Sequence, residues 1–265
     1  MLRIDQKKPF DYGYNPITTM DEKEDNARMD FGILKLAKNQ TETYFEGEKE
    51  IIFLLIQGKA TLKWQGNKTT VKRNSCFDEN PFVLHVPKKV KVTIRGESED
   101  TEISVSMTDN DKKFPAKFYT QEECRTEDRG KGTMKEACTR IVRTVIDYSN
   151  ASYSNLVIGE DIDYPGKWSS YPPHHHPQPE IYFYKFNPKQ GYGYCELGDE
   201  VVKVKENSTT KILNDATHPQ TTAPGYAMYY IWVIRHLEGN PYINPIFLPE
   251  HLWVTNPYAK IWPDK

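Results

Sequence analysis

Short β-rich runs at nearly regular spacing are the feature that most limits how this chain can fold. In the first half, glycine, asparagine and proline separate runs of branched and aromatic residues at 51–56, 60–64, 69–71, 82–86, 90–94 and 102–106. A spacing of about ten residues is typical of an all-β sandwich or barrel. Because Gly and Asn adopt the positive φ of tight hairpins, we expect turns at Gln57 and Gly58 and again at residues 65–67, and a meander of antiparallel strands.

The β pattern stops between residues 109 and 139 and then resumes. This stretch is charged and has no sustained apolar period, so we interpret it as a connector. New β-rich runs follow at 141–146, 156–158, 181–186, 191–197, 201–204, 211–213 and 228–234. With 265 residues the chain exceeds one ordinary domain. The sequence predicts two similar barrels, an N-terminal one with its linker at residues 1–139 and a C-terminal one at residues 140–265.

Charge and cysteine usage exclude several classes of partner. The 35 basic and 37 acidic residues are interspersed and leave a net charge of -2, so no field attracts nucleic acid. The start of the chain lacks the apolar stretch of a signal peptide, and no later window resembles a membrane span. We therefore expect a cytoplasmic protein without membrane contact. The four cysteines form no CxxC pair and are interpreted as reduced thiols.

Three consecutive histidines followed by a glutamate indicate a metal site. In an extended chain alternate side chains share a face, so His174 and His176 point the same way and His175 points oppositely. Pro177 and Pro179 interrupt the strand, yet they leave Glu180 close enough to supply a carboxylate ligand. This segment predicts a chelating pair of imidazoles with a third, oxygen ligand.

A fourth ligand is expected from His218, which lies in a turn just before a later β-rich run. Three imidazoles and one carboxylate suit one divalent ion, namely zinc, manganese, iron or nickel, and leave coordination positions open for water or substrate. The set is therefore catalytic in form. The isolated histidines His85, His236 and His251 have no such neighbours and are interpreted as hydrogen-bonded packing residues.

Several strings resemble the 5-deoxy-glucuronate isomerase family of inositol catabolism, within the cupin superfamily. The most specific is Trp168-Ser-Ser-Tyr-Pro-Pro-His-His-His; further matches lie at residues 180–184, 218–219, 223–226, 229–230 and 249–253. Residues 55–61, 76–78, 86–87 and 129–132 resemble the first, metal-free barrel and the linker of that family. The resemblance covers most of the chain.

The resemblance implies a bicupin, two tandem double-stranded β-helix (jelly-roll) barrels with the metal in the second. It also implies an aldose-ketose isomerase that converts 5-deoxy-glucuronate into 5-dehydro-2-deoxy-gluconate. The chain departs from the family at His175, where Lys is usual, in the shorter loop from His176 to Glu180, and at Trp232, where Asn is common. Residues 180–184 and 231–232 are also similar to the 4-deoxy-5-keto-uronate isomerases of pectin breakdown, which are the alternative.

The reaction and its substrate suggest further residues. Glu180, Tyr182 and Tyr229 are candidates for proton transfer, and Tyr184 for a substrate contact. A sugar-acid carboxylate favours an arginine fork, for which Arg129 and Arg235 are candidates, as are Arg140 and Arg143. A non-catalytic sugar-acid-binding cupin and a metal-dependent dioxygenase remain alternatives. The expected partner is a small sugar acid, and cupin edge strands are compatible with a homo-oligomer.

Overall fold

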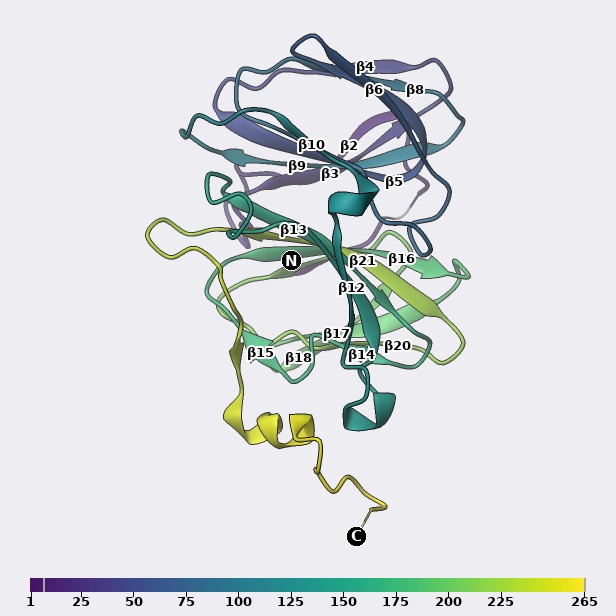
Figure 1. Cartoon of the computed structure of the whole chain (residues 1–265), viewed down its shortest axis with the longest axis vertical. Helices are drawn as coiled ribbons and strands as arrows, with labels where there is room; N and C mark the ends of the chain where they lie inside the picture. Colours follow the sequence, from purple (N-terminus) through teal and green to yellow (C-terminus); the bar gives the residue numbers. More distant parts are fainter. Residues whose placement is uncertain (7, 265) are drawn as a thin grey trace. The chain divides into compact units, whose positions relative to one another are not determined.

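The computed structural model describes residues 1–6 and 8–264 and is almost entirely β structure (Figure 1). The chain divides into two compact units, which we describe separately. One comprises Gln6–Arg125 and Val145–Val157, and the other comprises Met1–Asp5, Thr126–Thr144 and Ile158–Lys265. No helix within the described ranges has the length and apolar character needed to cross a membrane. A boundary between independently folding domains at residues 139 and 140 stays a prediction, which expression of the two pieces would test.

The first unit is built around one long strand, β5. Its strands are β2 (Gly13–Thr18), β3 (Asp30–Leu36), β4 (Thr41–Tyr44), β5 (Lys49–Trp64), β6 (Asn67–Arg73), β7 (Val83–Val86), β8 (Val92–Gly96), β9 (Thr101–Asp109) and β10 (Lys117–Tyr119), followed by the 3-10 helix η1 (Gln121–Glu123). The main path of the sheet runs β10-β7-β5-β9-β3-β2, while β6 and β8 pair with the second half of β5. Most of these pairs join strands that are not consecutive in the chain, so the expected meander is wrong.

The predicted turn at Gln57 and Gly58 is also wrong, because β5 continues through it. The pairing of β5 with β9 shifts register between Leu55 and Gln57, and Gly58 has a φ of 97°. A Cβ at Gly58 would lie 2.7 Å from the Cα of Thr101, so the glycine permits a bulge and a close backbone approach. The second predicted hairpin is confirmed: Gln65 and Gly66 both have positive φ and connect β5 to β6.

The interior of this unit is apolar. Its core packs Phe53, Leu62 and Trp64 with the branched residues of β8 and β9. A small cavity inside it is lined by apolar side chains alone, among them Phe53, Leu62 and Phe118. Such a lining supplies neither metal ligands nor hydrogen-bond partners for a sugar acid.

A buried polar pair lies on the other face of β5. His85 Nε2 is 2.7 Å from Glu50 Oε2, and neither side chain is exposed. Ser154 Oγ donates to the same carboxylate oxygen at 3.2 Å, and the backbone N–H of Asn155 donates to Oε1 at 2.7 Å. Glu50 therefore joins three partners from two segments, and such pairing avoids the cost of a buried polar group without partners.

We predict that Glu50→Ala lowers the free energy of unfolding by about 3–5 kcal/mol, because it leaves the buried His85 Nε2 and the Asn155 N–H without their partner, while Ser154 Oγ keeps the carbonyl of Leu156. Urea denaturation measures this change. Glu48→Ala is the matched control, because Glu48 is exposed and pairs only with the ammonium of Lys88, for which about 0–1 kcal/mol is expected. Equal losses in the two variants would contradict the assignment.

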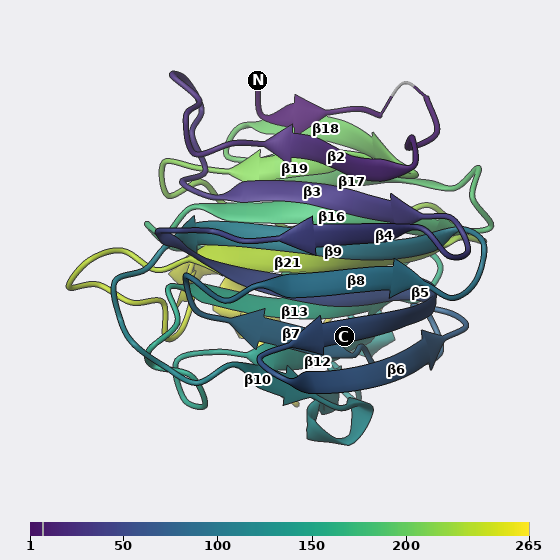
Figure 2. The same ribbon diagram turned by 90° about the horizontal axis from the view of Figure 1, so that it is seen from above.

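The second unit packs two sheets face to face. Its strands are β1 (Arg3–Ile4), β11 (Arg125–Arg129), β12 (Arg140–Ile146), β13 (Leu156–Asp163), β14 (Trp168–Ser169), β15 (His174–His175), β16 (Glu180–Asn187), β17 (Tyr192–Leu197), β18 (Glu200–Lys205), β19 (Thr209–Ile212), β20 (Gln220–Thr222), β21 (Ala227–Arg235) and β22 (Ile246–Phe247), with the 3-10 helices η2 (Met134–Glu136) and η3 (Pro249–Thr255). One sheet has the order β1-β19-β16-β21-β13-β12-β11. In Figure 2 its strands β19, β16, β21, β13 and β12 follow one another in this order from top to bottom. The other has the order β14-β20-β17-β18.

Residues 109–139, expected to be a connector, contain two strands. Lys117–Tyr119 pairs with β7 as β10, and Arg125–Arg129 lies at the edge of the seven-stranded sheet next to β12. All five residues of β11 are exposed, so this edge strand carries charge without burying it. Its five charged or polar residues show no apolar alternation, so the sequence pattern gave no sign of this strand.

Candidate metal centre and active site

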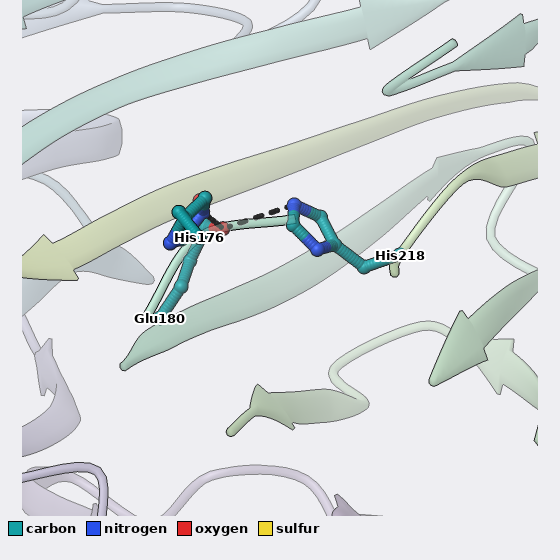
Figure 3. Close-up of side chains that lie close together, drawn as sticks. All are labelled: His176, Glu180 and His218. Carbon is teal, nitrogen blue, oxygen red and sulfur yellow. Dashed lines mark hydrogen bonds and ion pairs between the residues drawn. The ribbon is translucent and has the colours of Figure 1, made fainter. Parts of the chain in front are cut away.

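Three buried side chains converge inside the second unit. His176 follows β15, Glu180 begins β16, and His218 lies in the turn before β20. One potential ligand atom from each lies within 4.8 Å of the others. Glu180 Oε2 is 3.1 Å from His176 Nε2 and 3.4 Å from His218 Nε2 (Figure 3). This is the group of possible metal ligands that the structure forms among residues 1–6 and 8–264.

Backbone carbonyls orient the histidines of the site. Nδ1 of His174 lies 3.2 Å from the carbonyl oxygen of Pro172, Nδ1 of His176 lies 2.9 Å from that of Gln178, and Nδ1 of His218 lies 2.9 Å from that of Ala216. A carbonyl can only accept a hydrogen bond, so each Nδ1 carries the proton. In the neutral imidazole the lone pair is then on Nε2, the arrangement that metal-binding histidines use.

This arrangement fits a bound cation. Burial lowers the pKa of His218, so its ring is neutral at pH 7 and presents the Nε2 lone pair. Within the described part of the chain no group hydrogen-bonds this atom, although the side chain is fully buried. A lone pair that faces a buried carboxylate oxygen is electrostatically unfavourable unless a positive charge lies between them. The donor set of nitrogen and oxygen atoms suits a first-row divalent metal.

His174 lies next to this group. Its ring centroid is 4.7 Å from that of His218, and burial followed by the charge of His218 lowers its pKa to about 2. The strand β15 ends at His175, so His174 and His176 are not aligned by the pleat as expected; both still contact the ring of His218. His175 points elsewhere, with Nδ1 2.7 Å from Asp215 Oδ1.

The pairing of β16 with β21 decides which side chains share the face of Glu180. Tyr182 is paired with Trp232 and Tyr184 with Tyr230, and cross-strand partners lie on the same side of a sheet. The hydroxyl of Tyr182 is 3.3 Å from Ser170 Oγ, and the ring of Tyr182 is 5.9 Å from that of His218. Tyr182 therefore lies beside the ligand group.

The structure does not bring Tyr184 or Tyr229 to the ligand group. The Tyr184 hydroxyl is fully buried and bonds Gln220 Oε1 at 2.5 Å and Thr210 Oγ1 at 3.0 Å. Tyr229 alternates with Tyr230 along β21 and therefore faces the opposite side of the sheet, where its hydroxyl donates to a buried Glu160. The roles predicted for these two tyrosines stay predictions without support from their positions.

The candidate arginines are also separated. Arg129 is half exposed at the end of β11 and pairs with Glu127, and its pKa is raised because that hydrogen bond and the charge of Asp161 outweigh the lowering by burial. Arg235 lies on the same face as Tyr229 and donates to the carbonyl of His236. Arg140 and Arg143 are buried and pair with Asp161 and Glu160.

Sequence reasoning missed a polar network on β13. Asp161 Oδ2 accepts the Tyr230 hydroxyl at 2.9 Å and Arg140 Nε at 3.3 Å, and Oδ1 accepts Trp232 Nε1 at 3.0 Å. Asp163, two residues on, accepts Ser169 Oγ at 2.8 Å and has a pKa raised well above its usual value by burial and then by Asp161. Acidic residues at alternate positions inside a β-rich run were the available signal.

The segment after β21 forms a further wall that the sequence did not indicate. Tyr242 packs edge-on against His176 with ring centroids 4.8 Å apart, and Phe247 does the same against His174 at 5.5 Å. Gln178 Nε2 donates to the carbonyl of Asn240 at 2.9 Å, and β22 pairs with β15. These contacts hold His174 and His176 in place.

Comparison with known proteins agrees with this architecture and these motifs. Residues 4–254 match the model of the KduI/IolB family. The chain belongs to this family. The 5-deoxy-glucuronate isomerase of Halalkalibacterium halodurans is 28% identical over 258 residues, covering 88% of this chain and 92% of the relative. That of Geobacillus kaustophilus is 28% identical over 243 residues, covering 84% of each chain.

Solved structures confirm the all-β, cupin-like fold. An IolB-like protein from Salmonella typhimurium superposes with a TM-score of 0.85 at 21% identity, covering 96% of this chain and 99% of that chain. The oxalate decarboxylase of Lactobacillus farciminis superposes with a TM-score of 0.69 at 13% identity, covering 95% of this chain and 90% of that chain. The resemblance to an isomerase family inferred from the sequence motifs is confirmed by the family match and by the relatives named above.

We predict that His174 and His218 destabilise the metal-free protein as the pH falls from 7 to 5, a contribution that the raised pKa of Asp163 opposes. The folded state keeps His174 neutral down to about pH 2 and also depresses the pKa of His218, whereas both take up a proton near pH 6.5 once unfolded. At these two histidines the unfolded state therefore binds more protons below pH 6.5, so their contribution to stability falls with pH. Urea midpoints of chelator-treated protein at pH 7 and 5 measure the slope. His174→Gln should reduce it, and an unchanged slope in that variant would contradict the assignment.

Proposed function

We propose that this protein is a metal-dependent aldose-ketose isomerase that converts 5-deoxy-glucuronate into 5-dehydro-2-deoxy-gluconate in the cytoplasm. The observation that carries the proposal is the buried group of His176, Glu180 and His218, with every imidazole oriented to offer Nε2. Membership of a family whose curated relatives bear the name 5-deoxy-glucuronate isomerase supports the substrate.

His174, His176, Glu180 and His218 would hold the ion, which is zinc, manganese, iron or nickel. When bound, such an ion supplies a Lewis acid for the substrate's carbonyl and neighbouring hydroxyl oxygens. The protein supplies the orientation: backbone carbonyls hold the three rings, and the walls formed by Tyr242 and Phe247 cover two of them.

Tyr182 is the side chain best placed to donate a proton. Its hydroxyl is buried beside the ligand group, and burial followed by the charge of Glu180 raises its pKa well above the usual value. The phenol therefore stays protonated at neutral pH and can donate to an oxygen that becomes negative as the proton moves between adjacent carbons. Glu180 would be engaged as a ligand of the ion, which argues against its use as the base.

Arg129 is the arginine best placed for the substrate carboxylate. Its guanidinium is half exposed and electrostatically coupled to Asp161 and to Tyr242, which packs on His176. Arg235 lies on the opposite face of its sheet, and Arg140 and Arg143 are already paired with buried carboxylates. A planar fork at the rim would bind the carboxylate through two parallel hydrogen bonds.

One experiment separates this function from its alternatives. Metal content of the purified protein is measured, and proton NMR then follows 5-deoxy-glucuronate and 4-deoxy-5-keto-uronate before and after chelation. Chelator-sensitive conversion of the first supports the proposal, and conversion of the second alone indicates the pectin-type reaction. Bound metal without conversion of either sugar acid indicates a binding protein, and oxygen uptake indicates a dioxygenase.

We predict that His218→Ala abolishes both metal binding and turnover while the protein stays folded. The substitution removes one of the ligands from a buried site, and the rest of the second unit keeps its own core. Elemental analysis and circular dichroism are the measurements, and His251→Ala, a change outside the ligand group, is the control. Full activity of metal-depleted His218→Ala would contradict the mechanism.

We predict that Tyr182→Phe lowers kcat about 10²-fold or more with little change in metal content, because only the proton donor is lost. Tyr229→Phe is the comparison, because Tyr229 is the other tyrosine that the sequence suggested for proton transfer. Its hydroxyl bonds buried Glu160 on the opposite face of the sheet, so the loss should be in stability rather than in kcat. A larger kcat loss in Tyr229→Phe than in Tyr182→Phe would reverse the assignment.

A further inference from the structure

Trp232 lies on the side of the seven-stranded sheet that carries Glu180, and the proposed mechanism gives it no role. It is directly paired with Tyr182 across β16 and β21, so the two side chains project from the same side of the sheet as Glu180. Unlike its neighbours Tyr182 and Tyr230, Trp232 is only half buried. Part of this residue therefore stays accessible, and its side chain projects from the side of the sheet that carries Glu180.

The indole is held in one orientation by a buried carboxylate. Trp232 Nε1 donates to Asp161 Oδ1 at 3.0 Å, and the other oxygen of Asp161 is bonded to the Tyr230 hydroxyl at 2.9 Å and Arg140 Nε at 3.3 Å. Asp161 and Arg140 are both buried. A fully connected buried network of this kind rigidifies the groups that it joins.

Gly159 makes the room for this orientation. A Cβ at Gly159 would collide with the indole at Cζ2 and with the carbonyl oxygen of Arg143. The ring therefore lies directly against the bare backbone of β13. Together, Asp161 and Gly159 fix both the edge and the plane of the indole.

We propose that Trp232 is a specificity-determining residue whose indole surface contacts the deoxygenated carbon of the substrate. The inference rests on the proposed function, in which the substrate carries a methylene group next to its carboxylate. An aromatic face is an apolar surface that accepts C–H groups.

A hydroxyl at the same carbon would be disfavoured at this surface. The single polar group of the indole is its N–H, and that donor is already bonded to Asp161. A hydroxyl placed against the ring would lose water without gaining a partner, and such a buried polar group is costly. Trp232 would thus favour a 5-deoxy sugar acid over D-glucuronate, which has a hydroxyl at this carbon.

The test compares wild type with Trp232→Ala and Trp232→Phe. Two quantities are measured for each: KM for 5-deoxy-glucuronate, and the inhibition constant of D-glucuronate as a competitor. The open-chain fraction of each sugar is the same for every variant and cancels from their comparison. Trp253→Ala is the control, because Trp253 is 54% exposed and lies on η3. Metal content and melting temperature verify that each variant is folded.

We expect Trp232→Ala to raise KM about tenfold, the scale of one methylene contact, and to change the inhibition constant of D-glucuronate less than about twofold. Trp232→Phe should retain most of the discrimination because it keeps an apolar ring, and Trp253→Ala should match wild type. Equal changes for both sugars in Trp232→Ala, or no change for either, would overturn the proposal.

A binding measurement on the wild type tests the role of Trp232 separately from the proposed function. The protein has five tryptophans, so ¹⁵N-tryptophan labelling gives five indole N–H signals, and that of Trp232 is assigned by its loss in Trp232→Phe. A shift of this signal on adding 5-deoxy-glucuronate to zinc-loaded protein, with shielding of the sugar methylene protons, supports the proposal even if no turnover occurs and the proposed function fails. Turnover without such a shift overturns the role of Trp232 alone, and the absence of both overturns both.

Discussion

The burial of the Glu180 carboxylate between two imidazoles is the constraint around which the second unit is organised. A carboxylate in this position needs positive charge or several donors close by, because burial removes its hydration. The neighbouring rings direct Nε2 lone pairs toward it, since Nδ1 of each is occupied by a backbone carbonyl. A cation between these atoms would offset that cost, which is the physical basis for proposing a metal site here.

The sheet that carries Glu180 explains why these loops can hold such a site. Strand β16 is paired on both sides, with β19 and β21, and all its residues except the last are buried. One face of the pairing presents the tyrosines and Trp232 to the site, and the other presents residues such as Tyr229 and Arg235. Two adjacent residues of β21 therefore lie on opposite sides of the sheet, and only one of them can face the candidate site.

The two units share an architecture and differ in what fills it. The first unit contains an apolar core with a small apolar cavity, whereas the core of the second includes Tyr182, Tyr184 and Tyr230 with hydroxyl and carboxylate partners. Among the described residues the only group of possible metal ligands lies in the second unit. The candidate metal site is therefore assigned to the second unit, and its metal binding stays a proposal.

The sequence by itself determined the all-β class, the hairpin at residues 65 and 66 and three residues of the ligand group, because each depends on local φ preferences or on rare side chains in close spacing. Long-range pairing decided the rest. Gly58 has the same turn-forming character in the sequence as Gly66 but lies in a bulge of a continuous strand. The exposed segment β11 is a strand because it pairs at the edge of the seven-stranded sheet. The choice among the tyrosines and the network of Asp161 with Trp232 also came from tertiary structure, since strand register alone determines which side chains face each other.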